Sequence, residues 1–389
     1  MKSVKITLVL LLLLSMQVIA FSQERGIITK NRGEFIETID KTYKVNKGGT
    51  LYLSSDEGPI DVETWFEDKV RIVVIKRADV RNESRAEEIF EEIEVTITKS
   101  GKDVTVKGRT PWRRRRRSSV LSFEITVPYK YNVDVETDGG SIRIADLEGN
   151  LSANTEGGSI KVGQIKNGDV NVKTAGGSIK IVEIINGNGI AITAGGSIKV
   201  GDVSGDLSVK TSGGSISIGD TKGDIDASTA GGSIHIGESG GQVIANTAGG
   251  SISVEGSQGP IIVETAGGSI EITNARGFVE AETAGGDVEA ELIVSDKNID
   301  THVTLKTAGG DITVYLPSKL AATFDVELEI TRRAWRDYKI YSDFPLSISD
   351  DEGGWRDNKV IVAEGDINGG GDKIKIRTTN GDIRIKKIR

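Results

Sequence analysis

The chain has 389 residues, with 49 glycines, no cysteine and a formal net charge of −8 at neutral pH. The lack of cysteine excludes disulfides, thiolate metal sites and a thioether-linked lipid anchor. The acidic balance argues against a general nucleic-acid-binding protein.

The first 22 residues have the pattern of a secretory signal peptide. Lys2 and Lys5 precede an apolar run over residues 6–20, and small residues stand at the −3 and −1 positions of a cut before Gln23. The run is too short and wrongly flanked for a stable membrane anchor, and no second run of spanning length follows it. We therefore expect a mature chain without a transmembrane segment, exported to the periplasm or the cell surface.

Residues 23–132 are expected to form a β-rich N-terminal cap with one short helix. Ser84 followed by Glu87 is a capping-box pattern, which predicts that the helix opens there. Runs that alternate apolar and polar residues follow, for example over residues 94–98 and 122–127, and they predict short strands.

The same segment contains the strongest local charge of the chain, a tryptophan followed by five arginines: Trp112, Arg113, Arg114, Arg115, Arg116 and Arg117. Adjacent cations repel one another, which favours a solvated loop between two strands. The run is also a candidate contact for a polyanion or an anionic lipid head group, with the tryptophan as an interfacial aromatic.

From residue 133 to residue 316 a glycine returns about every nine residues. Two nine-residue halves alternate, one of the type Gly-Gly-Ser-Ile and the other of the type Gly-Asp-Val, so the full period is 18 residues. Such periods are typical of solenoids built from stacked units. Within each half, apolar residues alternate with polar ones, as at Ile216 and Ile218, and predict a strand with one buried face.

The repeat predicts an all-β protein, a single-chain parallel β-solenoid (β-helix) of 18-residue two-strand coils. Glycine is expected at the corners because it tolerates positive φ or a crowded backbone. Successive coils should pair about 4.8 Å apart. The open ends of such a stack need covering, and we expect residues 317–389 to form a C-terminal β cap.

Stacking should align equivalent residues in columns on the outside of the rod. On the Gly-Gly-Ser strand, the outward residue changes from basic to acidic along the chain: Arg143, Lys161, Lys180, Lys199, Ser217, His235, Ser253, Glu271 and Glu289. The other strand shows a similar drift, from Lys173 and Lys210 to Glu264 and Glu282. Solubility charge copied by repeat duplication explains this pattern, and so does a polarised rod that grips a polyanion. The four basic residues that begin the first series form a second candidate contact.

Several segments resemble the bacterial putative-adhesin family, whose relatives include head domains of autotransporter-adhesin-like proteins. They are the Thr-Ala-Gly-Gly-Ser-Ile coils, the strand 124–128 that leads into the repeats, and the closing segments 365–371 and 380–383. The similarity covers roughly residues 40–389. It implies a β-solenoid, an envelope location and an adhesive role, and it offers no catalytic residues to transfer.

We expect neither catalytic residues nor a cofactor or metal. The corners are too short to wall a cleft, and Asp206 and Asp224 lack the Gly-Gly-x-Gly-x-Asp pattern of calcium-binding coils. These aspartates should instead accept hydrogen bonds from nearby backbone N–H groups. The chain is thus interpreted as a non-enzymatic, exported cell-envelope protein. Its expected partner is an anionic polysaccharide, a lipid head group or an envelope protein, and not nucleic acid. A periplasmic envelope-stress or signalling accessory protein and a polysaccharide-active β-helix enzyme are the alternatives.

Overall fold

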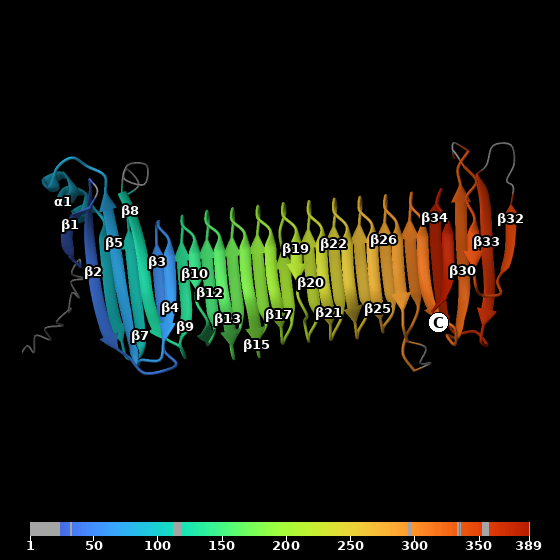
Figure 1. Ribbon diagram of the computed structural model, residues 1–389, viewed down its shortest axis with the longest axis horizontal. Helices are drawn as coiled ribbons and strands as arrows, with labels where there is room; N and C mark the ends of the chain where they lie inside the picture. The colour runs from blue at the N-terminus through green and yellow to red at the C-terminus, as the bar shows by residue number, and fades with distance from the viewer. Residues whose placement is uncertain are drawn as a thin grey trace, which may run out of the picture.

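The protein is a long rod with a wider end at each side (Figure 1). The computed structural model describes residues 24–31, 33–111, 119–294, 298–332, 334, 336–351 and 358–388. The expected signal peptide and the segment Trp112–Arg117 lie outside the described residues. Within the described part, no helix has the length and apolar character needed to span a bilayer.

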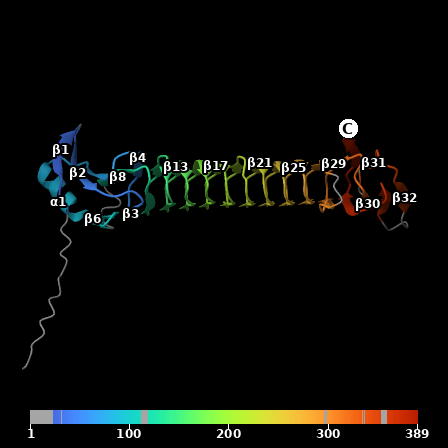
Figure 2. The same cartoon turned by 90° about the horizontal axis from the view of Figure 1, so that it is seen from below.

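Each coil of the rod contributes one strand to each of two sheets, which run along opposite sides of the rod (Figure 2). Sheet A carries the strands of the Gly-Gly-Ser halves: β10 (Ile142–Ile144), β11 (Leu147–Glu148), β13 (Ile160–Lys166), β15 (Ile179–Ile185), β17 (Ile198–Val203), β19 (Ile216–Ile218), β21 (Ile234–Ser239), β23 (Ile252–Ser257), β25 (Ile270–Ala275), β27 (Val288–Leu292) and β29 (Ile312–Pro317). Sheet B carries the strands of the other halves: β9 (Asn132–Thr137), β12 (Leu151–Thr155), β14 (Val170–Thr174), β16 (Gly189–Thr193), β18 (Leu207–Lys210), β20 (Ile225–Thr229), β22 (Val243–Thr247), β24 (Ile261–Thr265), β26 (Val279–Thr283) and β28 (Val303–Thr307).

Neighbouring coils pair in parallel and keep the same register from coil to coil. Ile216 lies opposite Ile234, and Ile234 lies opposite Ile252. These inward residues are each about 1% exposed, so aliphatic side chains of successive coils stack in the space between the sheets. The predicted parallel β-solenoid of two-strand coils is therefore confirmed.

The corner glycines are explained by crowding between coils. Gly232 does not have positive φ, but a Cβ built on it would lie 2.2 Å from the carbonyl oxygen of Gly214 in the preceding coil. The buried corner threonines use the same closeness, since Thr174 Oγ1 donates to the carbonyl oxygen of Gly158 at 2.7 Å. Of the two reasons expected for glycine, the structure thus selects a crowded backbone at this corner.

At the N-terminal end, the order of coils in space differs from their order in the chain. The strands β3 (Thr50–Ser55) and β4 (Ile60–Trp65) pair in parallel with β9 and β10 on one side. On their other side they pair in parallel with β7 (Asp103–Arg109) and β8 (Ser119–Pro128), which come later in the chain. The earlier segment is therefore held between two later ones.

Antiparallel strands and the helix extend the sheets at this end. The strands β1 (Ile27–Asn31), β2 (Glu34–Lys44) and β5 (Lys69–Ala78) continue sheet A beyond β8, and β6 (Glu94–Ser100) continues sheet B beyond β7. The helix α1 (Glu83–Glu92) is capped by Asn82, whose side chain accepts a hydrogen bond from Arg85 N. The prediction that Ser84 opens the helix is wrong. Asn82, two residues earlier, is the N-cap, because its side chain makes the capping hydrogen bond.

The C-terminal end repeats this exchange of order. The last two strands, β34 (Asp372–Thr379) and β35 (Ile383–Ile388), pair in parallel with β28 and β29. The strands that precede them, β30 (Ala322–Ile330) and β31 (Ile340–Ser342), lie on their far side. Two antiparallel strands, β33 (Lys359–Ile367) and β32 (Ser347–Asp351), continue sheet B outward. The division of the chain after residues 132 and 316 stays a prediction, since coils on both sides of each boundary share the same sheets.

Candidate functional site

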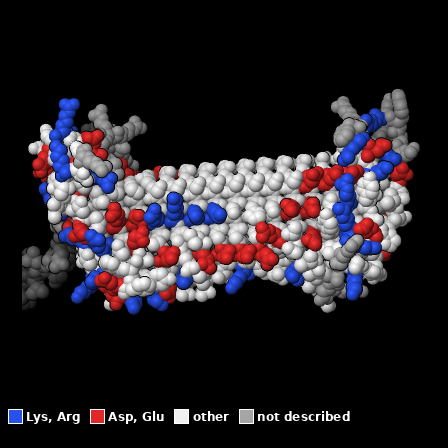
Figure 3. All heavy atoms as spheres, in the orientation of Figure 1, with Lys and Arg blue, Asp and Glu red and all other residues white. Residues whose placement is uncertain are grey.

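The basic residues expected to form a column do lie in register on the outer side of sheet A. Arg143 lies opposite Lys161, Lys161 opposite Lys180, and Lys180 opposite Lys199. Each is exposed and stands between two buried aliphatic residues of its strand, so it points away from the core. Figure 3 shows a row of basic side chains in the N-terminal part of this face. We call these four residues the basic column.

The positive charge of the basic column is only weakly balanced within the chain. Arg143 Nη1 lies 4.0 Å from Asp61 Oδ2, at the limit of an ion pair. Lys161, Lys180 and Lys199 form no ion pair with any residue that the structure describes. Like charges about 5 Å apart in water repel by about 1 kcal/mol per neighbouring pair. An external anion would therefore be attracted to this row.

The column continues through a neutral stretch into an acidic one. Ser217, His235 and Ser253 follow Lys199 in register, and Glu271 and Glu289 come next. On sheet B the corresponding drift is interrupted, because Ile192 lies between Lys173 and Lys210 and Lys210 pairs with Asp226 at 3.1 Å. The charge gradient is thus continuous on sheet A alone. That it binds a polyanion stays a prediction.

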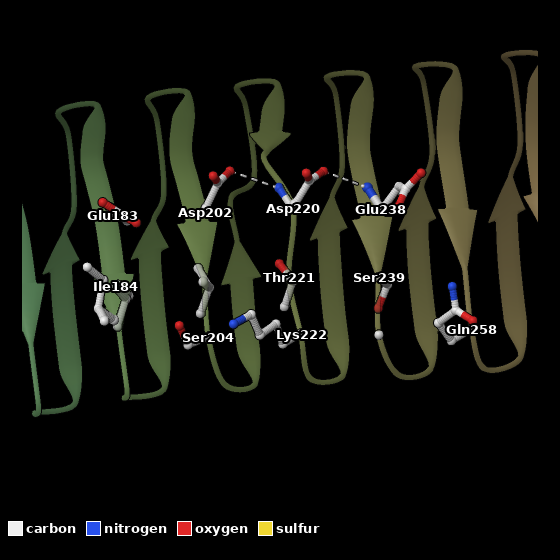
Figure 4. Close-up of a pocket in the computed structure, with 13 residues that line it drawn as sticks. Glu183, Ile184, Asp202, Ser204, Asp220, Thr221, Lys222, Glu238, Ser239 and Gln258 are labelled. Carbon is white, nitrogen blue, oxygen red and sulfur yellow. Dashed lines mark hydrogen bonds between the residues drawn. The ribbon is translucent and has the colours of Figure 1, made fainter.

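The structure also shows a second column that the sequence analysis missed. Glu183, Asp202, Asp220 and Glu238 occupy successive coils of sheet A, and we call them the acidic column (Figure 4). Asp202 Oδ1 accepts a hydrogen bond from Asp220 N at 3.1 Å, and Asp220 Oδ1 accepts one from Glu238 N at 3.0 Å. One oxygen of each of these two aspartates thereby binds backbone, and the other can face solvent.

The acidic column borders a groove of about 640 Å³ on the side of the rod. Beside this column, the inward residues become smaller and more polar from coil to coil. Ile184 and Val203 are followed by Thr221 and Ser239, all of them buried. These residues line the groove together with the acidic column. The sequence does contain a signal for the acidic column. An acidic residue follows the lysine by three positions in Lys180-x-x-Glu183 and again in Lys199-x-x-Asp202, so aligning the coils at this offset would have found these acids.

The corner aspartates act as expected within the backbone. Asp206 Oδ1 accepts a hydrogen bond from Asp224 N at 2.9 Å, and Asp224 Oδ1 accepts one from Gln242 N at 2.7 Å. The prediction that they bond nearby N–H groups is confirmed, and these N–H groups belong to the next coil. Over the described ranges of the chain, no group of three or more histidines, cysteines and carboxylates is arranged to hold a metal ion.

Each of the two histidines lies close to a carboxylate that the sequence analysis did not assign to it. His302 Nδ1 lies 2.8 Å from Asp300 Oδ1, its Nε2 lies 3.4 Å from Glu280 Oε1, and its ring stacks on Phe278. Burial raises the pKa of Asp300, but the hydrogen bonds from His302 outweigh this effect and hold it below its ordinary value. His235 Nε2 lies 3.4 Å from Glu255 Oε1 on the outer face.

The two facing parallel sheets and their ordered outer columns define a β-solenoid. The chain belongs to the Toastrack DUF4097 family, whose model matches residues 50–240 and again residues 206–386. The two matches overlap over residues 206–240, so together they span more of the chain than either match alone. This membership agrees with the resemblance to the putative-adhesin family.

Two solved structures match this chain over most of their length. One is described as a putative cell adhesion protein from Clostridium sporogenes, at 11% identity and a TM-score of 0.18, covering 90% of this chain and 100% of that one. The other is described as a putative adhesin from Bacteroides fragilis, at 12% identity and a TM-score of 0.24, covering 90% of this chain and 97% of that one. A search of curated proteins finds no match.

Proposed function

We propose that the protein is a non-enzymatic, adhesin-like scaffold of the cell envelope that binds an anionic polysaccharide along the basic column. The observation that carries this proposal is the run of three lysines in register, Lys161, Lys180 and Lys199, without ion pairs among the described residues. Export rests on the signal-peptide pattern of the first 22 residues. The family and the smooth rod support a scaffold with repeated contacts.

A linear polyanion suits this surface because both carry charge at a regular pitch. The lysines recur about every 4.8 Å along the rod, so an extended chain of carboxylates can contact several of them at once. Each contact with an exposed lysine is weak, about 0.2–1 kcal/mol. Once one carboxylate of the polysaccharide is bound, the next carboxylates of the same chain are held near the neighbouring lysines. Their effective concentration is therefore high, and the weak contacts add up. Binding should therefore be salt-sensitive and depend on the length of the polysaccharide.

The test replaces Lys161, Lys180 and Lys199 with serine together. A matched control replaces three basic residues of sheet B with serine, so that the net charge changes equally: Lys173, Lys210 and Lys306. Polygalacturonate binding is measured by calorimetry at about 20 mM and about 300 mM salt.

We expect the sheet A variant to bind at least about tenfold more weakly at low salt, and the sheet B variant to bind within about twofold of the parent protein. Both variants should keep the melting temperature of the parent, because the replaced side chains are outside the core. Equal losses in the two variants would show that net charge alone drives binding. A parent protein that does not bind polygalacturonate would contradict the proposal itself.

A further inference from the structure

The basic and acidic columns lie beside each other on one face of the rod. Figure 3 shows a basic row with an acidic row below it. Lys180 precedes Glu183 by three residues, and Lys199 precedes Asp202 by three, which corresponds to roughly 10 Å along a strand. Neither lysine forms an ion pair with a described residue. The chain therefore presents two separated lines of opposite charge with the same pitch.

Small residues line much of the surface between the two columns. Gly163 and Gly201 occupy it in two of the coils, and the exposed Val182 stands between them. The groove beside the acidic column adds space next to Asp202 and Asp220. The glycines allow another backbone to approach closely beside Val182, and the groove gives long lysine side chains room to reach the carboxylates.

We propose that this face of sheet A pairs with the same face of a second copy, about a two-fold axis that runs along the rod between the columns. This rotation exchanges the two columns while each coil stays at its own level. Lys180 then faces Glu183 of the other copy, and Lys199 faces Asp202. A two-fold interface is self-complementary, so each contact forms twice.

The neighbouring coils fit the same arrangement. Arg143 faces Asp146 of the second copy, while Ser217 and His235 face Asp220 and Glu238, so no like charges meet between the columns of these coils. The pitch matches along the whole contact because both copies have the same coil spacing. Turning the second copy end for end would instead place the acidic column against itself, and like charges across an interface are unfavourable. The charges thus select parallel rods.

This pairing goes beyond the proposed polysaccharide binding and competes with it, because both use the basic column. The acidic column distinguishes pairing from polysaccharide binding, because its residues contribute to the proposed pairing and not to the proposed polysaccharide binding. Replacing Glu183 and Asp202 with lysine should therefore weaken pairing and leave polygalacturonate binding intact. Loss of binding in the sheet A serine variant with unchanged pairing would retain the proposed function and overturn the pairing.

The experiment measures the mass of the mature chain by sedimentation velocity at about 20 mM salt. The first variant carries Lys180→Glu and Lys199→Glu, the second carries Glu183→Lys and Asp202→Lys, and the third combines all four changes. We expect each double variant to weaken dimerisation at least about tenfold, and the combined variant to return to within about threefold of the parent. A mixture of the two double variants should form a one-to-one dimer.

Circular dichroism checks that every variant keeps its strand content, since all four positions are exposed or half-buried. A parent chain that stays monomeric up to about 1 mM at low salt overturns the proposal, because this concentration corresponds to only about 4 kcal/mol of binding free energy. Failure of the combined variant to dimerise overturns it as well, since the charges would then be complementary without effect.

Discussion

Replacing Gly232 with alanine should destabilise the rod severely, whereas the same change at the adjacent Gly231 should be tolerated. A Cβ at position 232 would lie 2.2 Å from the oxygen and 2.4 Å from the carbon of the Gly214 carbonyl. At position 231, the nearest atom would be Gly213 O at 3.2 Å. Neither glycine has positive φ, so the difference comes from the distance between coils and not from the backbone conformation.

The magnitude follows from what must move at position 232. The two coils have to separate by about 1 Å at this corner to restore an ordinary contact, which stretches the hydrogen bonds from Ile216 N to Ser233 O (2.9 Å) and from Ser233 N to Ser215 Oγ (3.3 Å). Weakening two hydrogen bonds costs about 1 kcal/mol each, and overpacking adds about 1–3 kcal/mol. We expect a total of about 3–5 kcal/mol. At position 231 a contact only slightly too short is offset by the lower entropy of the unfolded chain, for a net change within about 1 kcal/mol.

Urea unfolding followed by far-ultraviolet circular dichroism measures both variants. The midpoint for Gly232→Ala should fall well below that of the parent, and the midpoint for Gly231→Ala should stay close to it. Equal shifts, or a larger shift for position 231, would refute the claim that contact between coils explains the corner glycines.

Two further predictions concern the core and the C-terminal coil. Ile216→Asp should prevent folding because it buries an unpaired charge at a site that is 1% exposed. Ser217→Asp on the outer face should change the free energy of unfolding by less than about 0.5 kcal/mol. If circular dichroism shows that both variants fold equally well, the inner and outer faces of this strand are reversed. Burial raises the pKa of Asp311, but the hydrogen bonds from Arg384 and from Asp382 N, together with the charges of Arg384 and Arg336, outweigh this effect and hold the pKa below the ordinary value. This carboxylate therefore contributes stability above pH about 3.9 and loses it as the pH falls further. The melting temperature of the parent should fall more steeply than that of Asp311→Asn between about pH 4 and 2, and parallel curves would contradict this reasoning.

The repeated part of the fold could be predicted from the sequence because its signals are local. An inward pair such as Ile216 and Ile218 defines the buried face of one strand, and the 18-residue period repeats that definition in every coil. Parallel stacking in register then follows, and it aligns the basic column without further information. Each of these steps depends on residues within one or two coils.

The exchange of coil order at both ends could not be predicted in this way. The strands β3 and β34 have the same alternating pattern as their neighbours, and nothing local to them specifies which strand they pair with. Their partners are decided by how the two ends pack as a whole. The acidic column was missed for a different reason, since it lies beyond a bend where Gly163 and Gln164 are both half-buried and the strict alternation of faces stops.

Lysine footprinting tests the central claim most directly, namely that the basic column is the surface that binds a polyanion. The protein is acetylated in the presence and absence of polygalacturonate, and the modification of each lysine is quantified by mass spectrometry. We predict strong protection of Lys161, Lys180 and Lys199 and little protection of Lys173 and Lys210 on the opposite sheet. Equal protection on both sheets, or protection confined to sheet B, would contradict this account.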